Sequence, residues 1–371
     1  MNGVWVAAIN GNFPRQKERS SQKLKEDIDF IVERSAAMGF NAIFFQVRPS
    51  CDALYKSKIF PWSQWLCGRA GAAPDNDFDP LEYFCSAAHK KNVALHAWIN
   101  PYRIKAKKGQ ALEEILAVNK GLRPLKKFIL PSSDGNFYLD PGEPRVRDFV
   151  VRGAKEILKN YDVDGLHLDD YFYPDSGIDD SSSFKKYGDG SSLEDFRRES
   201  VGALIKSLGD LVKNEKPGSL FGVSPFGIWA NKGPANPYGS QTKGKESYSA
   251  HFADSVAWIQ RGLVDYIAPQ IYWERSHKLA SYEALARWWN DAVEGSGVLL
   301  YIGMADYKAA AARNDPKSPW HGTAELEAQL ELNKELKNVS GEIHYNFDSL
   351  LAPGIKEFYE NLANEGSKEY N

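Results

Sequence analysis

Two adjacent aspartates end an apolar segment within the run "DVDGLHLDDYFYP", which begins at Asp162. An ionised carboxylate that leaves water costs several kcal/mol unless it is paired, so core strands avoid such residues. Alternation along an extended strand sends Gly165, His167 and Asp169 to one face and Asp170 away from it. We therefore expect Asp169 to reach a functional site, unless a buried cation pairs with it. Asp170 either serves the same site or caps or pairs with a neighbouring strand.

Two carboxyl groups near one another suit the hydrolysis of a glycosidic bond. One acts as the acid and the other as nucleophile or base, around an oxocarbenium-like transition state. Asp169 is the candidate nucleophile or general base. The candidate acids are, in order, Asp170, Asp140 in "FYLDPGEPRV" and Glu274 after "PQIYW". Asp140 is equally suited to capping the helix expected from Pro144.

The same alternation in other apolar segments predicts a ring of polar and aromatic side chains beside Asp169. "AIFFQVRP" sends Phe44, Gln46 and Arg48 to one face, although a lone histidine such as His96 in "HAWINPYR" is more typical of a core. Polar members would bind sugar hydroxyls and N-acetyl groups, and tryptophans would stack on sugar faces. The predicted substrate-binding residues are Gln46, Arg48, His96, Trp98, Asn100, Tyr102, Arg103, His167, Tyr171, Tyr173, Trp229, Gln270, Tyr272 and Trp273.

Eight short apolar segments alternate with helical patterns, which indicates a parallel sheet. In the helical pattern 23–39, Leu24, Ile28 and Ile31 recur at helical spacing, and another helix is expected from Pro80 with Asp79 as its N-cap. The expected strands are 4–9, 42–47, 93–100, 164–170, 220–225, 265–273, 299–305 and 342–347. Further helices are expected over 144–160, 193–214, 251–262, 281–294 and 323–338.

The lengths of the connections predict which parallel sheet this is. Connections from helix to strand are short, such as "GFN" and "KNV", whereas those from strand to helix span 48–79, 101–143, 171–192, 226–250 and 306–322. With eight units, this asymmetry predicts an α/β fold, a single (β/α)8 TIM barrel over 1–371 with its active site on the long-loop face. A doubly wound sheet would need a glycine-rich phosphate turn after the first strand, and "INGNFPR" is not one.

Composition narrows the class of partner. The 46 basic and 49 acidic residues give a net charge of −3, so we expect no nucleic-acid partner. The three cysteines lack metal-ligand spacing. No apolar run reaches the ~18 residues that span a membrane. The opening "MNGVWVAAIN" predicts a strand rather than a secretion signal, which is also compatible with a signal already removed. The sequence does not indicate an oligomeric state.

Two other functions suit the same pattern. A metal-dependent barrel hydrolase needs clustered imidazoles, but "HAW" stands where such barrels carry H-x-H, so we expect neither metal nor cofactor. Aromatic residues make up 13% of the chain, with 10 Trp, and these fill a large core or line a sugar cleft. A barrel that binds glycans without cleaving them would show the same aromatic residues.

Seven segments together resemble glycosyl hydrolase-like family 10, formerly domain of unknown function 187. They are "GVWVAAIN", "FNAIFFQVRPSCDALYKSKIFPWSQWLCG", "HAWINPYR", "FYLDPGEPRVRDF", "VDGLHLDDYFYP", "FGVSPFGIWAN" and "DYIAPQIYW", in order over nearly the whole chain. The resemblance implies a (β/α)8 barrel of the cell envelope or a secreted protein. It implies a polysaccharide substrate such as the glycan strands of peptidoglycan, a related amino-sugar polymer, or another envelope or dietary polysaccharide.

Overall fold

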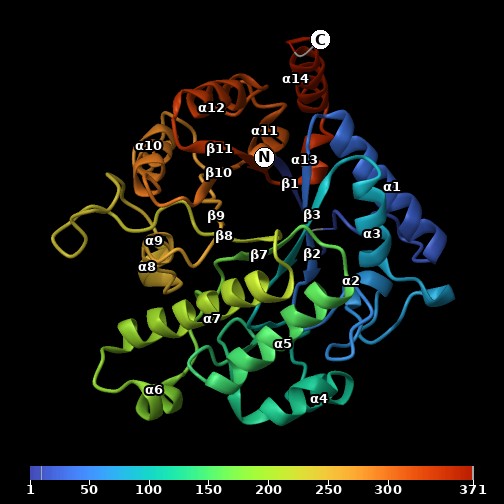
Figure 1. Ribbon diagram of the computed structural model, residues 1–371, viewed down its shortest axis with the longest axis vertical. Helices are drawn as coiled ribbons and strands as arrows, with labels where there is room; N and C mark the ends of the chain where they lie inside the picture. Colours follow the sequence, from blue (N-terminus) through green and yellow to red (C-terminus); the bar gives the residue numbers. More distant parts are fainter. Residues whose placement is uncertain (10, 370–371) are drawn as a thin grey trace.

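Eight parallel strands close into a barrel in the computed structural model, which describes residues 1–9 and 11–369 (Figure 1). The order around the barrel is β1-β11-β10-β9-β8-β7-β3-β2, and every neighbouring pair is parallel. The predicted (β/α)8 architecture is therefore confirmed. The strands are β1 (Asn2–Val6), β2 (Ala42–Arg48), β3 (Ala94–Ile99), β7 (Gly165–Asp169), β8 (Leu220–Ser224), β9 (Tyr266–Ile267), β10 (Leu299–Met304) and β11 (Val339–His344).

Large aromatic side chains fill the barrel interior. Trp5, Phe44 and Tyr266 come from three different strands and pack in one buried cluster. Glycines on the neighbouring strands make the room for them. A Cβ at Gly222 would lie 2.2 Å from the Tyr266 ring, and one at Gly165 would lie 2.3 Å from a buried histidine. The interior is therefore a packed floor beneath the mouth of the barrel, as this fold requires.

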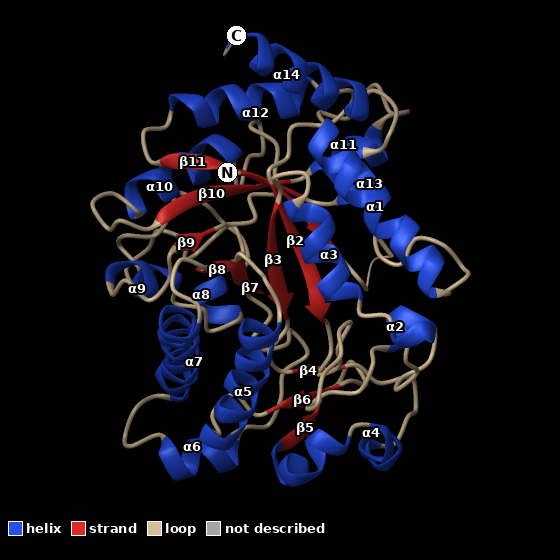
Figure 2. Cartoon of the chain, turned by 45° about the vertical axis from the view of Figure 1, so that its right-hand side comes forward, coloured by secondary structure: helices blue, strands red, loops and turns tan. Residues whose placement is uncertain are grey.

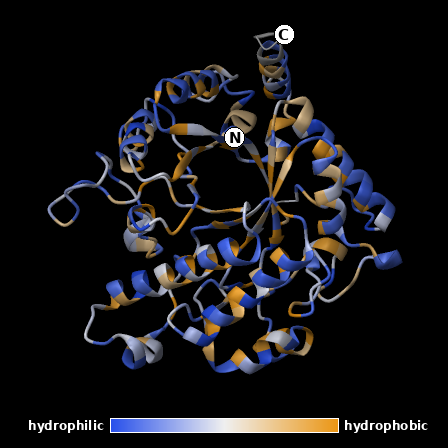
Figure 3. Cartoon of the chain, viewed as in Figure 1, coloured by the Kyte–Doolittle hydropathy of each residue, from blue (hydrophilic) through white to orange (hydrophobic). Residues whose placement is uncertain are grey.

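Helices surround the barrel, and the strands are more hydrophobic than the outer surfaces of these helices (Figure 3). The Asp79 carboxylate accepts from the backbone N–H groups of Leu81 and Glu82, which confirms the predicted N-cap. The helix predicted over 251–262 is shorter, because Asp254 caps it later in the chain. The helices that pack around the barrel are α1 (Ser21–Ala37), α3 (Pro80–His89), α5 (Pro144–Asn160), α7 (Leu193–Glu215), α9 (Ser255–Gln260), α10 (Tyr282–Ala292), α12 (Ala324–Glu335) and α14 (Ile355–Glu369).

The long connections build a second layer at the carboxyl ends of the strands. In Figure 2 the arrowheads of β2 and β3 point toward a small antiparallel sheet of order β4-β6-β5. This sheet was not predicted, because strands of two or three residues are too short to show alternation. The elements of the connections are α2 (Gln64–Cys67), η1 (Asp75–Asp77), β4 (Arg103–Ile104), α4 (Leu112–Val118), η2 (Lys120–Phe128), β5 (Ile129–Pro131), β6 (Phe137–Leu139), α6 (Ser181–Tyr187), α8 (Ser247–Ala250), α11 (Asp306–Ala312) and α13 (Phe347–Leu350).

The three cysteines are free thiols, so no disulfide links these layers. Across the described part of the chain, no helix is both long and apolar enough to cross a membrane.

Candidate active site at the mouth of the barrel

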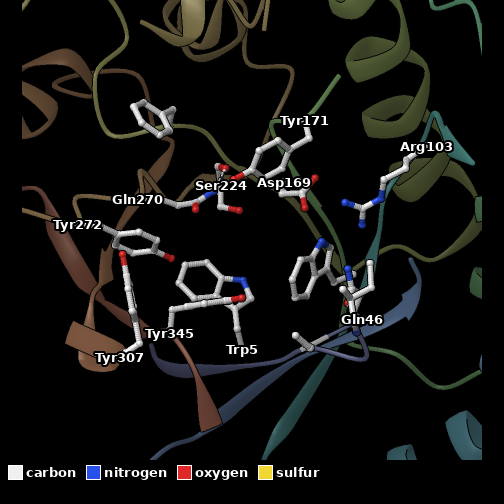
Figure 4. A pocket seen from close by; sticks show the side chains of 14 residues that line it. Trp5, Gln46, Arg103, Asp169, Tyr171, Ser224, Gln270, Tyr272, Tyr307 and Tyr345 are labelled. Carbon is white, nitrogen blue, oxygen red and sulfur yellow. Dashed lines mark hydrogen bonds between the residues drawn. The ribbon is translucent and has the colours of Figure 1, made fainter. Parts of the chain in front are cut away.

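A cavity of about 440 Å³ opens at the carboxyl ends of the strands (Figure 4). Its size falls in the roughly 300–1,000 Å³ range of small-molecule sites, and its position is the one that active sites occupy in this fold. The lining combines aromatic faces with a few polar groups. The lining residues are Trp5, Ala7, Ile9, Gln46, Trp98, Arg103, Asp169, Tyr171, Ser224, Phe226, Gln270, Tyr272, Tyr307 and Tyr345.

Asp169 lies in this cavity, held by a chain of amide side chains. Asn100 follows β3, and its Nδ2 donates to both carboxylate oxygens of Asp169, at 2.7 and 2.6 Å. Gln46 of β2 donates from Nε2 to Asn100 Oδ1 at 2.8 Å, and its Oε1 accepts from the backbone N–H of Ala8 and Ile9. Three neighbouring strands and the loop after β1 therefore fix one carboxylate, as a preorganised catalytic group requires.

Burial raises the pKa of Asp169, because the charged form loses its water. The positive charge of Arg103 opposes this rise most strongly, followed by the Asn100 amide and the backbone N–H of Tyr171. Arg103 is anchored by Nε and Nη2, which donate to the Pro49 carbonyl at 3.2 and 3.0 Å. Within the described residues, no carboxylate forms an ion pair with Arg103 within 4.0 Å, and its guanidinium points toward Asp169 (Figure 4).

Asp170 is buried next to the cavity but does not line it. Its Oδ2 accepts from the backbone N–H of Phe226, so Asp170 ties the end of β7 to the chain after β8. Its Oδ1 is buried without a hydrogen-bond partner among the described residues. Burial raises the pKa of Asp170 to about 6, while the nearby His251 opposes the rise. The two adjacent aspartates therefore point in different directions, as alternation predicts.

Histidines and tyrosines form the layer beneath the cavity. Trp5 Nε1 donates to His167 Nε2 at 3.1 Å, and His167 Nδ1 lies 3.0 Å from the Tyr266 hydroxyl. Burial lowers the pKa of both His167 and His96, the latter to about 4, so both rings are neutral. His167 therefore supports the cavity floor. His96 lies deeper, 3.2 Å from Tyr266, which corrects the prediction that it binds substrate.

The wall on the other side of the cavity is uncharged. Gln270 Nε2 donates to the Ser224 carbonyl at 2.8 Å. Tyr272 points its hydroxyl into the cavity, with Tyr307 and Tyr345 next to it (Figure 4). Tyr272 and Tyr345 have ring centroids 6.0 Å apart. The cavity thus runs from a charged end to an aromatic end.

Arg48 lies outside the cavity, which corrects the alternation argument for that residue. The pairing of β2 with β3 shifts register between Gln46 and Arg48, so residues two apart no longer share a face. Arg48 is fully buried between the barrel and α5, with its guanidinium 4.5 Å from the Phe60 ring and close to Gly153. It packs against the core and does not reach the mouth.

Asp140, Tyr102 and Tyr173 form a buried group behind the mouth. Asp140 Oδ1 accepts from the Gly142 N–H at 2.9 Å and from the Ser183 hydroxyl at 3.1 Å. Burial raises the pKa of Asp140 to about 6. Both tyrosines are buried beside it. None of the three lines the cavity, so the structure does not bring Asp140 to the side of Asp169.

Trp229, Trp273 and Glu274 also lie off the cavity. Trp229 stacks on Trp288 at 5.8 Å and donates to Asp254. Trp273 packs its edge against Phe226 at 5.6 Å, one layer behind the lining. Glu274 follows it, close to Lys308 rather than to Asp169. Of the other predicted residues, Gln46, Trp98, Arg103, Asp169, Tyr171, Gln270 and Tyr272 line the cavity, and Asn100 contacts Asp169.

Sequence reasoning missed several lining residues, including Trp5, Tyr307 and Tyr345. Trp5 lies between Val4 and Val6 of β1, and alternation sends it to the opposite face from these two. Tyr345 directly follows β11. Applying alternation to the first and last strands would have found Trp5 and Tyr345. Tyr307 lies in the first turn of α11, where no strand pattern reaches it.

Residues 1–321 match the family model described as Glycosyl hydrolase-like 10. The chain is 37% identical to Glycosyl hydrolase YngK of Bacillus subtilis (strain 168), over 94% of this chain and 68% of that protein. It is 36% identical to Glycosyl hydrolase DigH of Escherichia coli (strain K12), over 96% and 85%.

Two solved structures share the fold at low identity. The glycoside hydrolase domain of PgaB from Bordetella bronchiseptica superposes with a TM-score of 0.58 at 12% identity, over 96% of this chain and 97% of that chain. The catalytic domain of β-amylase from Paenibacillus polymyxa gives 0.58 at 13% identity, over 98% of each chain. At such identities the likeness concerns the fold alone.

Proposed function

We propose that this chain, which belongs to the glycosyl hydrolase-like 10 family and is a glycoside hydrolase, cleaves the glycan strands of peptidoglycan or a related amino-sugar polymer. Asp169 would be its catalytic carboxyl group. The observation that carries the proposal is that Asp169 lines an aromatic cavity and is held there by Asn100. The resemblance noted in the sequence implies the same substrate class. That substrate would be met in the cell envelope, which is where we propose that the protein acts.

The sequence predicts Asp169 as nucleophile or general base, but we propose that it acts first as the acid, because no other carboxylate of the described residues lines the cavity. Burial raises the pKa of Asp169 and so increases the fraction of the protonated carboxyl, which can donate to the glycosidic oxygen as the bond breaks. The ionised form left behind would be stabilised by Asn100 and Arg103, and would then accept a proton from the attacking water. The roles of Asp170, Asp140 and Glu274 as the acid lose support, because none of them lines the cavity.

Arg103 supports a substrate with an acidic substituent. Its guanidinium lies at the charged end of the cavity, anchored on one side by the Pro49 carbonyl. A planar guanidinium binds carboxylates well, and an anion on the substrate would neutralise this cation. In peptidoglycan, muramic acid carries a lactyl carboxylate next to the glycosidic bond. Arg103 is therefore the residue that we propose selects muramic acid over its uncharged counterpart.

The aromatic side chains support binding of sugar rings. Trp5 and Trp98 line the cavity, and Tyr171 and Tyr307, which also line it, are partly exposed. Apolar sugar faces stack on such rings, while the polar groups between them bind hydroxyls.

The proposal is tested by comparing two polymers, one with and one without the lactyl carboxylate of muramic acid. Purified protein is incubated with peptide-free peptidoglycan strands and with chitin oligosaccharides, and the products are separated by chromatography. We expect release from the strands, and Arg103→Gln should lower kcat/KM by about tenfold to a hundredfold more on the strands than on chitin, since only the strands carry the carboxylate. Asp291→Asn, on the exposed surface of α10, serves as the control variant. Cleavage of chitin but not of the strands would overturn peptidoglycan as the substrate.

A further inference from the structure

Asp169 is the one carboxylate among the described residues that line the cavity. Glycosidases that work with two carboxylates place them roughly 5–10 Å apart on either side of the bond that breaks. The other wall of this cavity consists of Gln270, Tyr272 and further tyrosines, none of which is ionised at neutral pH. Among the described residues, the cavity therefore offers no second carboxylate on the side where one would act.

Asp170 does not fill this gap. Its side chain is fully buried, and Oδ2 is engaged by the backbone N–H of Phe226. Reaching an anomeric carbon above Trp5 would require breaking that bond and reversing the direction of the side chain at the end of β7.

Gln270 and Tyr272 instead offer the complement of a secondary amide. The Nε2 of Gln270 must be the atom that faces the Ser224 carbonyl, because a carbonyl can only accept. Oε1 of Gln270 is therefore left as an acceptor beside the cavity. The Tyr272 hydroxyl points into the cavity and forms no hydrogen bond to a described residue, so it is available as a donor. Burial raises the pKa of Tyr272, which keeps this hydroxyl protonated.

In Figure 4 the Trp5 ring lies below the space that Tyr272, Gln270 and Asp169 border. A sugar ring stacked on Trp5 would thus have the acid at one edge and the amide-binding pair at the other. A 2-acetamido group lies on the carbon next to the anomeric carbon, so its N–H would meet Gln270 Oε1 and its carbonyl would meet the Tyr272 hydroxyl. An acetamido group fits this pair better than a hydroxyl does, because its nitrogen and its oxygen can bond to Gln270 and Tyr272 separately, whereas a hydroxyl has a single heavy atom.

We propose that the second catalytic group is the 2-acetamido group of the substrate, which Gln270 and Tyr272 orient toward the anomeric carbon. This inference rests on the proposed hydrolysis of an amino-sugar polymer. The acetamido oxygen forms a bond to the anomeric carbon as the bond to the leaving oxygen breaks, and the leaving oxygen takes the proton of Asp169. The resulting oxazolinium ion is opened by water, which bonds to the anomeric carbon and returns a proton to Asp169. The product keeps the configuration of the substrate.

The inference is tested on one polymer whose acyl groups are exchanged. Peptide-free peptidoglycan strands are N-deacetylated and then re-acylated with acetyl, fluoroacetyl or difluoroacetyl groups. We expect re-acetylated strands to be cut at the native rate, and kcat to fall about tenfold or more with each fluorine, because fluorine withdraws electrons from the attacking oxygen. Equal rates across the fluorine series would overturn the inference. Failure to cut even native strands would instead contradict the proposed function.

The variant Tyr272→Phe tests whether Tyr272 positions the acetamido group of the substrate or only supports the structure of the cavity. Tyr272→Phe should lower kcat about tenfold to a hundredfold and weaken the dependence of rate on fluorine number, with KM changed little. Tyr83→Phe, on the outer helix α3, is the matched control and should leave both unchanged. The anomer first formed, read by NMR, should have the configuration of the substrate. An inverted product, or a Tyr272→Phe enzyme with native kinetics, would contradict the assignment.

Discussion

Two buried polar networks lie on opposite sides of the barrel, and they differ in access to the cavity. The mouth network joins Gln46, Asn100 and Asp169 at the ends of β2, β3 and β7. The closed network joins Asp306, which follows β10, to a histidine of β11 and a tyrosine of α14. Both centre on a buried aspartate just at or after a strand end.

The closed network is sealed by packing. His344 Nδ1 lies 3.0 Å from Asp306 Oδ2, and the Tyr359 hydroxyl donates to Asp306 Oδ1 at 2.6 Å. Phe40 packs against both the His344 and Tyr359 rings. None of these residues lines the cavity. Their neighbours in the chain do, however, so this network fixes the place where the aromatic end of the cavity is built.

A buried carboxylate with histidine and tyrosine partners does not by itself make a functional site. Asp306 has partners that suit a catalytic triad, yet no ligand can reach it, so its contribution is to stability. Asp169 has simpler partners, but one side of it faces a cavity. Access and not partner chemistry distinguishes the two.

The largest expected effect comes from Asp169→Asn. Removing the acid should lower kcat by about 10²–10⁴-fold, the range of general acid catalysis. The free energy of unfolding should stay the same or rise, because the variant no longer buries an ionisable carboxyl. Glycan turnover and urea denaturation measure the two quantities. If the variant lost both turnover and much of its stability, the mouth network would be structural, like the closed one.

Asp306→Ala should give the opposite pattern. The Tyr359 hydroxyl and His344 Nδ1 would be left buried without an acceptor, at a cost of about 1–3 kcal/mol each. We expect the free energy of unfolding to fall by about 3 kcal/mol in urea denaturation, and kcat to change only a few-fold. Tyr359→Phe removes one hydroxyl and should cost about 1 kcal/mol. Loss of turnover without loss of stability would instead show that Asp306 serves catalysis, contrary to the distinction drawn between the two networks.

Asp140→Asn should change stability with pH and leave turnover unchanged. The pKa of Asp140 is about 6 in the fold against an ordinary 3.8, so the folded state holds this proton more tightly than the unfolded chain. Stability from this group is present at low pH and is lost as pH rises through about 6, by up to about 3 kcal/mol. The variant should therefore match the native protein near pH 3 and exceed its unfolding free energy at pH 7. A native protein that gains stability relative to the variant between pH 4 and 7 would contradict this sign.

The smallest effect is expected from Asn100→Ala. Its amide donates to both oxygens of Asp169 and so lowers the pKa of that carboxyl. Without it the pKa of Asp169 rises further, and the alkaline limb of the pH–kcat profile should move to higher pH. Arg103→Gln removes a cation and should move the limb in the same direction. A limb that stays in place in both variants would assign it to a group other than Asp169.

The barrel and the centre of its site could be predicted from the sequence, because strand alternation and loop length are local patterns. They located Asp169, Gln46 and Gln270 correctly at the mouth. Alternation failed at Arg48, where an irregular register after Gln46 turns the side chain outward. Local patterns do not reveal such irregularities, since they depend on how two strands pair.

The rest of the site depends on tertiary structure. Tyr307 reaches the cavity from the first turn of α11. The carboxylate of Asp170 instead turns away from the cavity and accepts a hydrogen bond from the backbone N–H of Phe226, in the loop after β8. Both depend on contacts between segments far apart in the chain. The absence of a second carboxylate from the described lining could be seen only after Asp140 and Glu274 had been located away from it.

The most direct test of the central claim, that Asp169 drives hydrolysis of a glycan, is digestion in water enriched in ¹⁸O. Peptide-free peptidoglycan strands are incubated with the native protein and with Asp169→Asn, and the released saccharides are analysed by mass spectrometry. We predict that the native protein releases saccharides with one ¹⁸O atom at each new reducing end, and that the variant releases none above buffer. Equal release by Asp169→Asn, or products that carry no ¹⁸O, would contradict the account.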